Sequence, residues 1–262
     1  MDEPQLNRTI LTAGQVALIS GASVGIGRAT ALALAARGLR LALLARRPDP
    51  LAEVAALALE AGAPEVLVSP CDVREESAVQ EAVAATVSRF GRIDVLLNNA
   101  GLSLNGEVDG YSMADWRTVL DTNLTGTFLL CREVLPTMKA QRSGQILNVS
   151  SGAGRTGIRG MAAYCASKFG VVGLTEALGH EVRAFQIRVA VLMPGSVATD
   201  FSRVANRRPL GEATLEPEEI GYAMLPEEVA SVIVAMLGQP EQAWMSEVVL
   251  RPLNLELRRS RP

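Results

Sequence analysis

The sequence predicts a doubly wound α/β fold, in which a parallel β-sheet is covered by helices on both faces. Apolar runs of strand length alternate along the chain with longer helical patterns, and most of these runs lack strict polar alternation. A run that is apolar throughout is typical of a strand buried on both faces, as in a parallel sheet. The composition, 48% hydrophobic and 20% charged in 262 residues, fits one domain that can bury a sizeable core.

The first expected strand is Gln15 to Ser20, followed by a helical pattern from Gly25 to Arg37 and a second strand from Leu39 to Ala45. The same alternation recurs, and each helical stretch is long enough for the right-handed crossover that joins parallel strands. The sheet is expected to hold about seven strands. The others lie at Glu65 to Ser69, Val95 to Leu97, Gln145 to Val149, Arg188 to Leu192 and Glu247 to Leu250, with helices near 51–61, 75–90, 115–140, 161–185 and 226–237.

Several function classes are disfavoured by composition. The formal charge of −3 lacks the basic excess of a nucleic-acid binder. The longest apolar stretches are shorter than a membrane span, and the start, Met1 to Gln5, has neither a basic nor an apolar signal region. Cys71, Cys131 and Cys165 show no metal-binding spacing. We therefore expect a cytoplasmic protein with no membrane, nucleic-acid or metal partner.

A glycine-rich turn lies where the first strand ends and the first helix begins. It reads Ser20-Gly21-Ala22-Ser23-Val24-Gly25-Ile26-Gly27. Glycines at such a turn let the backbone approach a pyrophosphate closely, while the helix N-terminus offers free N–H groups and a partial positive charge. A glycine-rich turn alone is weak evidence, but its place in the first strand–helix unit predicts a dinucleotide-phosphate site.

Two arginines, Arg46 and Arg47, follow the second strand, where a dinucleotide fold places the group that meets the adenosine ribose. An acidic residue there binds the free 2′-hydroxyl of NAD, whereas the planar fork of arginine can bind a 2′-phosphate through two hydrogen bonds. The pair therefore favours NADP(H) over NAD(H). The alternative is a solvated arginine pair just beyond a strand.

Tyr164 and Lys168 lie four apart on a predicted helix, and so on one face of it. An ordinary tyrosine has a pKa of roughly 10, and a neighbouring ammonium lowers that pKa toward working pH. The pair predicts that Tyr164 acts as a general acid toward a carbonyl oxygen. Because many helices carry such a pair for structural reasons, the hypothesis depends on its surroundings.

Ser151 strengthens the hypothesis, because it follows a predicted strand in a glycine-rich turn shortly before Tyr164. A hydroxyl at the carboxyl edge of the sheet can donate a hydrogen bond to a carbonyl and stabilise the charge that develops on its oxygen. A serine hydrolase is disfavoured, because His180 is the single histidine and has no evident acid partner.

Together and in this order, these residues resemble the short-chain dehydrogenase/reductase family, from about Gln15 to Leu250. The glycine turn is similar to the family's TGxxxGxG motif, with Ser20 in place of threonine. Asn98 to Gly101 resembles its NNAG segment, and Tyr164 to Lys168 its YxxxK motif. Asn123 resembles the fourth member of the catalytic set, and Pro194 to Thr199 the segment that touches the nicotinamide.

The resemblance implies a single-domain Rossmann-like fold over residues 1–262, with a cofactor half at about 15–110 and a catalytic and substrate half at about 111–252. The stretch from Pro194 to Pro226 is long for a loop in a compact domain, and such loops tend to be lids or binding segments, so we expect a lid at about 194–226. It implies the catalytic residues Asn123, Ser151, Tyr164 and Lys168, with Asn123 holding a water in the proton relay. Cofactor contacts are implied for Gly21, Ser23, Gly25, Ile26, Gly27, Arg46, Arg47, Asp72, Val73, Asn99, Ala100, Gly101, Tyr164, Lys168, Pro194, Gly195, Val197 and Thr199.

The expected function is NADPH-dependent, reversible reduction of a ketone or aldehyde to an alcohol. One alternative is reduction of 3-oxoacyl thioesters, but relatives with that activity typically carry a Gly-Gly segment where this chain reads Glu247 to Leu253. Others are a non-catalytic dinucleotide-sensing scaffold and an isomerase or epimerase. Arg155 and Arg159 could meet an acidic substrate, although exposed loop arginines are more common. The resemblance also implies a homotetramer or dimer formed through the helices near 115–140 and 161–185.

Overall fold

A computed structural model of the chain describes residues 11–201, 205, 223–240 and 243–253. Its sheet has seven strands, all paired in parallel, in the order β3-β2-β1-β4-β5-β6-β7. This confirms the predicted doubly wound α/β class. The strands are β1 (Val16–Ser20), β2 (Arg40–Ala45), β3 (Val66–Pro70), β4 (Val95–Asn98), β5 (Gly144–Val149), β6 (Ile187–Pro194) and β7 (Glu247–Leu250).

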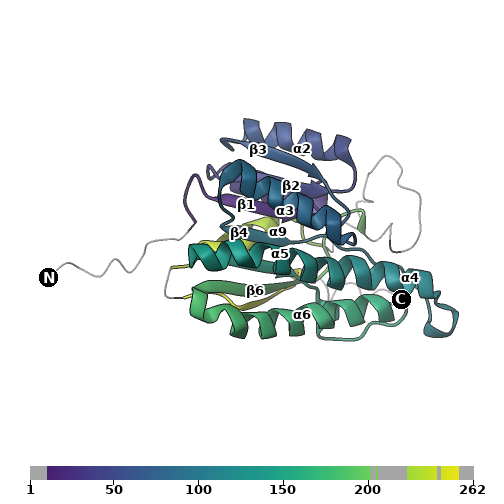
Figure 1. Cartoon of the computed structure of the whole chain (residues 1–262). Coiled ribbons are helices and arrows are strands. Elements are labelled where there is room, and N and C mark those ends of the chain that lie inside the picture. The colour runs from purple at the N-terminus through teal and green to yellow at the C-terminus, as the bar shows by residue number, and fades with distance from the viewer. Residues whose placement is uncertain (1–10, 202–204, 206–222, 241–242, 254–262) are drawn as a thin grey trace.

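Two helical layers cover the sheet, as expected for strands without polar alternation. One buried cluster packs residues of α1, α2 and α9 on one face, and another packs residues of α3, α5 and α6 on the other. Figure 1 shows α3, α5 and α6 side by side across the face toward the viewer. The helices are α1 (Gly25–Ala35), α2 (Pro48–Glu60), α3 (Glu76–Phe90), α4 (Met113–Leu120), α5 (Gly126–Gln141), α6 (Ala162–Val182) and α9 (Pro226–Leu237).

The prediction of a single helix near 115–140 is wrong in one respect. A π-helical turn, Asp121–Thr125, separates α4 from α5 and contains Asn123. Such a turn widens the helix locally, and turns of this kind are frequent at functional sites. Apolar periodicity does not reveal it. Within this turn, the side chain of Asn123 bonds the backbone of Leu102, which lies outside the helix.

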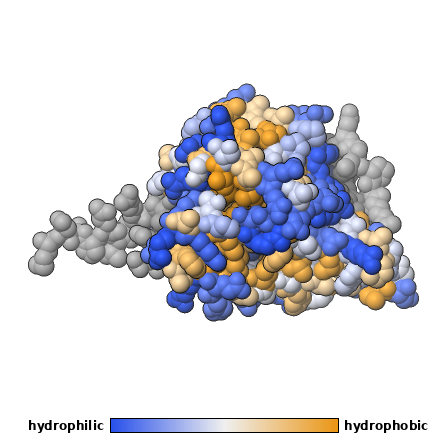
Figure 2. All heavy atoms as spheres, viewed as in Figure 1, coloured by the Kyte–Doolittle hydropathy of each residue, from blue (hydrophilic) through white to orange (hydrophobic). Residues whose placement is uncertain are grey.

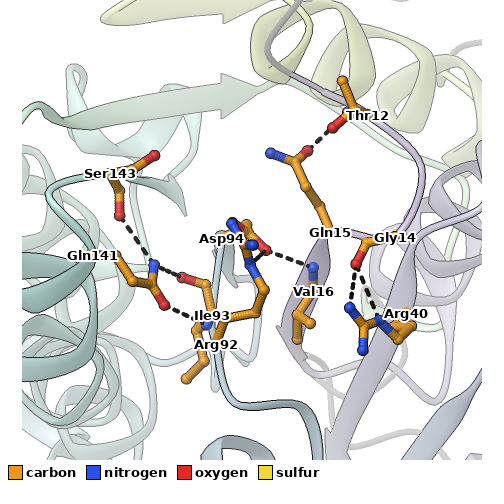
Figure 3. Close-up of polar contacts among 10 residues, drawn as sticks. All are labelled: Thr12, Gly14, Gln15, Val16, Arg40, Arg92, Ile93, Asp94, Gln141 and Ser143. Carbon is orange, nitrogen blue, oxygen red and sulfur yellow. Dashed lines mark hydrogen bonds and ion pairs between the residues drawn. The ribbon is translucent and has the colours of Figure 1, made fainter.

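The amino edge of the sheet is held by the carboxylate of Asp94 (Figure 3). Its Oδ2 accepts hydrogen bonds from the backbone N–H of Val16 and from Nε of Arg92, both at 2.8 Å, and Nη2 of Arg92 lies 2.6 Å from Oδ1. Beside it, Gln141 bonds both backbone groups of Ile93. These contacts join the loop before β4 to β1 and to the end of α5, at the edge opposite the carboxyl ends of the strands.

Most of the expected lid at 194–226 lies outside the described residues. The structure describes residues 194–201, 205 and 223–226 of this segment. Among the helices that the structure describes, none combines the length and the apolar character that a bilayer crossing requires.

Candidate active site

The site forms at the carboxyl ends of β1, β4, β5 and β6. β1 is the point where the strand order reverses, since β2 and β3 extend to one side of it and β4 to β7 to the other. In open α/β sheets, ligands bind in the crevice outside the strand ends at such a switch point. The glycine turn, the Asn98–Gly101 segment, Ser151 and Pro194 all lie at or just after the ends of strands that finish at this edge.

The glycine turn is closed by contacts that a side chain would prevent. Gly21 and Gly25 have φ values of +63° and +55°, which L side chains rarely adopt. A Cβ on Gly27 would lie 2.2 Å from the carbonyl oxygen of Gly21 and 2.6 Å from Nδ2 of Asn99. The amide of Asn99 donates to the carbonyls of Ser20 and Gly21, at 3.2 and 3.1 Å. The absence of side chains at these glycines therefore lets Asn99 pack against the turn and bond its backbone.

Helix α1 begins inside this turn, at Gly25, and no side chain caps its N-terminus. Its first N–H groups are therefore left without side-chain partners, and the helix dipole adds a partial positive charge there. An anion such as a pyrophosphate fits this arrangement. Ser23 is half-buried beside it, whereas the side chain of Ile26 packs against the apolar core, so only its backbone is suited to a phosphate.

The ribose corner lies where β2 and β3 end together. Ala45 is in register with Pro70, and the N–H of Cys71 donates to the carbonyl of Ala45 at 2.9 Å. Arg46 and Asp72 follow these residues, and Arg47 precedes α2 as its N-cap. Both arginines are exposed. Asp72 is paired with Arg74 through a 2.6 Å contact, and Val73 is buried against Gly126.

Asn123 is completely buried, and its side chain is held by the protein. Its Oδ1 accepts from the N–H of Leu102 at 2.8 Å, while its Nδ2 donates to the carbonyl of Leu102 at 2.8 Å and to Oγ of Ser167 at 2.9 Å. Its carbonyl accepts a hydrogen bond from Thr127. A water held by this residue would therefore have to meet its backbone carbonyl rather than its amide.

Ser167 was missed by the sequence analysis, although it stands between Tyr164 and Lys168. Its hydroxyl is buried, accepts from Asn123 and donates to the carbonyl of Tyr164 at 2.7 Å. It therefore connects the π-helical turn to the helix that carries Tyr164 and Lys168. A small hydroxyl residue between Tyr164 and Lys168 on one helix was the available signal.

Tyr164 lies near the carboxyl end of β5, and the structure brings it together with Ser151. Ser151 lies close enough to the phenol to lower its pKa as a hydrogen-bonding group, and its hydroxyl accepts from the N–H of Ala153 at 3.2 Å. Tyr164 is 7% exposed, and its ring lies 5.4 Å from the ring of Phe201. Phe201 comes from the segment expected to form a lid, so a described part of that segment packs against the Tyr164 ring.

The expected effect of Lys168 on Tyr164 is not the dominant one. Burial raises the pKa of Tyr164 to about 12, and the hydrogen bond from Ser151 opposes this rise only partly. Burial also lowers the pKa of Lys168 to about 8. The Nζ of Lys168 donates to the carbonyl of Val149 at 2.8 Å and lies 5.7 Å from the centroid of the Tyr164 ring. Desolvation of both groups therefore outweighs the attraction between ammonium and phenolate in the chain alone.

The remaining predicted contacts enclose the same edge. A Cβ on Gly101 would lie 3.4 Å from Nζ of Lys168, and a Cβ on Gly25 would lie 3.0 Å from Cγ2 of Thr199. Gly195 donates from its N–H to the carbonyl of Leu250 at 2.7 Å. The segment that follows β6 is thereby fixed against the end of β7 and across the glycine turn. Ala100, next to Gly101, donates from its N–H to Oγ of Ser20. Val197, in the segment after β6, forms a β-bridge with Met224.

Two candidate substrate-binding arginines are already paired. Arg155 forms an ion pair with Glu247, and Arg159 forms one with Glu107 at 2.8 Å. These carboxylates neutralise both guanidinium groups, which argues against an acidic substrate at this loop. Three or more His, Cys, Asp or Glu side chains placed to hold a metal ion are not found in the described part of the chain.

Comparisons with known proteins agree with this geometry. The family model described as short chain dehydrogenase matches residues 15–209. A 3-oxoacyl-[acyl-carrier-protein] reductase of Synechocystis sp. is 37% identical over 238 residues, which cover 91% of this chain and 94% of the relative.

Two solved structures are similar in sequence and in fold. A metagenomic short-chain oxidoreductase in complex with NADP has a TM-score of 0.79 and 33% identity, over 92% of this chain and 98% of the other. An NAD+-bound xylitol dehydrogenase has a TM-score of 0.80 and 31% identity, over 91% and 97%. The relatives thus include proteins bound to either nicotinamide dinucleotide.

Proposed function

Because this chain belongs to the short-chain dehydrogenase/reductase family and is an oxidoreductase of alcohol and carbonyl groups, we propose that it uses NADPH to reduce a ketone or aldehyde. The observation that carries the proposal is the pairing of Tyr164 with Ser151 at the edge where the glycine turn lies. A protein that only binds dinucleotide has no chemical need for a phenol held in this way.

The residues present fit a dinucleotide. The N–H groups at the start of α1 would hold its phosphates, and the Asn99–Gly101 segment would border the ribose next to the nicotinamide. Arg46 and Arg47 would meet a 2′-phosphate, with Asp72 and Val73 beside the adenine. Pro194 and the residues after it would lie against the nicotinamide. Bound NADPH supplies the hydride that reduces the carbonyl carbon.

The protein supplies the proton and the alignment. Ser151 would donate a hydrogen bond to the substrate oxygen and stabilise the negative charge that develops there. Tyr164 would transfer its phenolic proton to that oxygen. Its raised pKa, about 12, keeps the phenol protonated at neutral pH, which is the form that a general acid needs. Lys168 and Asn123 would supply the route by which the phenol regains a proton.

Tyr164→Phe tests the assigned acid. Removal of the hydroxyl is expected to lower kcat for reduction by about 10²- to 10⁴-fold, the usual contribution of general acid catalysis. The dissociation constant for NADPH, measured by calorimetry, is expected to change little, because the ring remains. Full activity in this variant would refute the assignment.

Cofactor preference rests on Arg46 and Arg47. Comparison of kcat/KM with NADPH and with NADH tests it, using one ketone substrate chosen by screening a panel of ketones, aldehydes and 3-oxoacyl thioesters. A higher kcat/KM with NADH would overturn the argument from the two arginines.

A second candidate, reduction of a 3-oxoacyl thioester, is favoured by the 37% identical 3-oxoacyl-[acyl-carrier-protein] reductase. Against it, the chain continues after β7 with Arg251 and Pro252, and the latter packs against Gly195. The thioester arm of the same panel separates the two candidates. Absence of NADPH oxidation with every carbonyl would revive the scaffold and isomerase alternatives.

We also propose a homo-oligomer, a dimer or tetramer, in the cytoplasm. Phe128 on α5 and Phe169 on α6 are 45% and 46% exposed, and Figure 2 shows hydrophobic patches among hydrophilic ones over this face. Exposed aromatic residues on neighbouring helices are suited to association. Light scattering that finds only a 27.8 kDa species would reject the oligomer.

A further inference from the structure

The ribose corner combines groups of opposite charge that have conflicting effects on a 2′-phosphate. Arg46 and Asp72 follow neighbouring strands that end in register. The pKa of Asp72 lies below its ordinary value, mainly through hydrogen bonds from Arg74 and also through the charge of Arg46. Asp72 is therefore ionised at neutral pH and lies within electrostatic reach of the guanidinium that is expected to bind phosphate.

An uncompensated carboxylate at this corner would oppose NADPH. It would repel the doubly charged 2′-phosphate, and it would compete with that phosphate for Arg46. It would not oppose NADH in this way, because the 2′-position of NADH carries a neutral hydroxyl and no charge that a carboxylate would repel. Whether this corner favours NADPH or NADH therefore depends on whether another group neutralises the Asp72 carboxylate.

Arg74 neutralises Asp72 through four hydrogen bonds. Its Nε lies 3.0 Å from Oδ1 and 3.1 Å from Oδ2, its Nη2 lies 2.6 Å from Oδ2, and its backbone N–H donates to Oδ1 at 3.1 Å. The planar guanidinium thus faces both oxygens of the carboxylate. Arg46, in contrast, is exposed and makes no hydrogen bond or close ion pair with another described residue.

We infer that Arg74 is a specificity-determining residue: by clamping and neutralising Asp72, it leaves Arg46 available for the 2′-phosphate and so permits selection of NADPH over NADH. The inference rests on the proposed cofactor preference and assigns part of its cause to a residue outside the expected phosphate contacts. Arg74 acts through Asp72 and is not placed in contact with the cofactor.

The test is the ratio of the NADH and NADPH dissociation constants, measured by calorimetry without substrate. Arg74→Gln keeps a hydrogen-bonding side chain but removes the charge. At a corner this exposed, loss of one charge is expected to weaken NADPH binding about five- to tenfold and to leave NADH binding within about twofold. Arg74→Gln combined with Asp72→Asn removes both charges and is expected to return the ratio to the wild-type value, even if both affinities fall.

A matched control is Arg92→Gln, which removes an arginine from the Arg92–Asp94 pair at the opposite edge of the sheet. It is expected to leave the ratio unchanged. If Arg74→Gln lowers both affinities equally, or if the double variant fails to restore the ratio, Arg74 has only a structural role and the inference is overturned. A wild-type preference for NADH would overturn the cofactor proposal itself and this inference with it.

Discussion

The ammonium nitrogen of Lys168 lies 5.7 Å from the centroid of the Tyr164 ring and donates its hydrogen bond to the carbonyl of Val149. The four-residue spacing thus brings the two side chains together, but the ammonium is anchored to the strand that precedes Ser151. Both groups are almost completely buried. Their burial makes the charged form of each one costly, and this has measurable consequences for stability.

The stability of the chain is expected to rise with pH where Lys168 titrates. Its pKa is lowered from 10.5 to about 8 in the folded chain, so the unfolded chain binds more protons between these values. The free energy of unfolding therefore increases as pH rises through this interval, by about 2 kcal/mol at pH 10. Tyr164 has a raised folded pKa, about 12, so its contribution is lost only as pH rises from 10 toward 12.

Urea unfolding of the wild type and of Lys168→Met at pH values from 7.5 to 10 measures this effect. The variant also leaves the carbonyl of Val149 without its partner, which adds an offset that does not depend on pH. The expected result is that the wild type gains stability relative to the variant as pH rises. Parallel curves for the two proteins would show that Lys168 titrates normally in the folded chain.

Ser167→Ala is expected to lower kcat more than it changes the KM for NADPH. The variant removes the acceptor for Nδ2 of Asn123 and the donor to the carbonyl of Tyr164, so the π-helical turn loses this hydrogen bond to α6. We expect a loss of about 1–3 kcal/mol in stability from the unpaired buried amide, and about a tenfold fall in kcat from misplacement of the catalytic groups.

Thr86→Ala is the matched control for that variant. Thr86 is also completely buried and bonds a carbonyl one turn earlier, but it lies in α3, away from the site. It is expected to lose stability and to keep kcat at temperatures where both variants are folded. Equal kcat values for the two variants would assign Ser167 a structural role only.

Gly27→Ala is expected to abolish dinucleotide binding. The added methyl group would meet the carbonyl oxygen of Gly21 at 2.2 Å and Nδ2 of Asn99 at 2.6 Å, so the glycine turn would have to open. Gly173→Ala, on an exposed position of α6 with no atom within 4 Å of the added Cβ, is the control and is expected to bind normally. Fluorescence titration with NADPH measures both, and unchanged binding by Gly27→Ala would exclude the glycine turn as the phosphate site.

Asp94→Ala is expected to destabilise the fold without changing cofactor affinity. It removes the acceptor of the buried Val16 N–H and the partner of Arg92 at the amino edge of the sheet (Figure 3). The cost is expected to be about 1–3 kcal/mol, since Arg92 is half-exposed and can be solvated. Thermal unfolding measures the loss; a weaker NADPH affinity in the folded variant would show that this edge influences the site.

The positions of the central strands were predictable because these strands are largely apolar and buried on both faces. The strand Glu247 to Leu250 was placed at its observed bounds, and the helix 226–237 likewise. The turn between α4 and α5 was not predictable from apolar periodicity, and the bonds that Asn123 makes there go to Leu102, which is outside the helix. The same holds for Arg155 and Arg159, whose acidic partners lie on other segments.

The sequence by itself determined the fold class, the glycine turn and the set of polar residues at the strand ends, because periodicity and glycine conformation are local properties of the chain. Only the tertiary structure decided the ionisation of Tyr164 and Lys168, the anchoring of Asn123 by Ser167 and the neutralisation of Asp72 by Arg74. These depend on burial and on the position of hydrogen-bond partners, which follow from packing in three dimensions rather than from residue spacing.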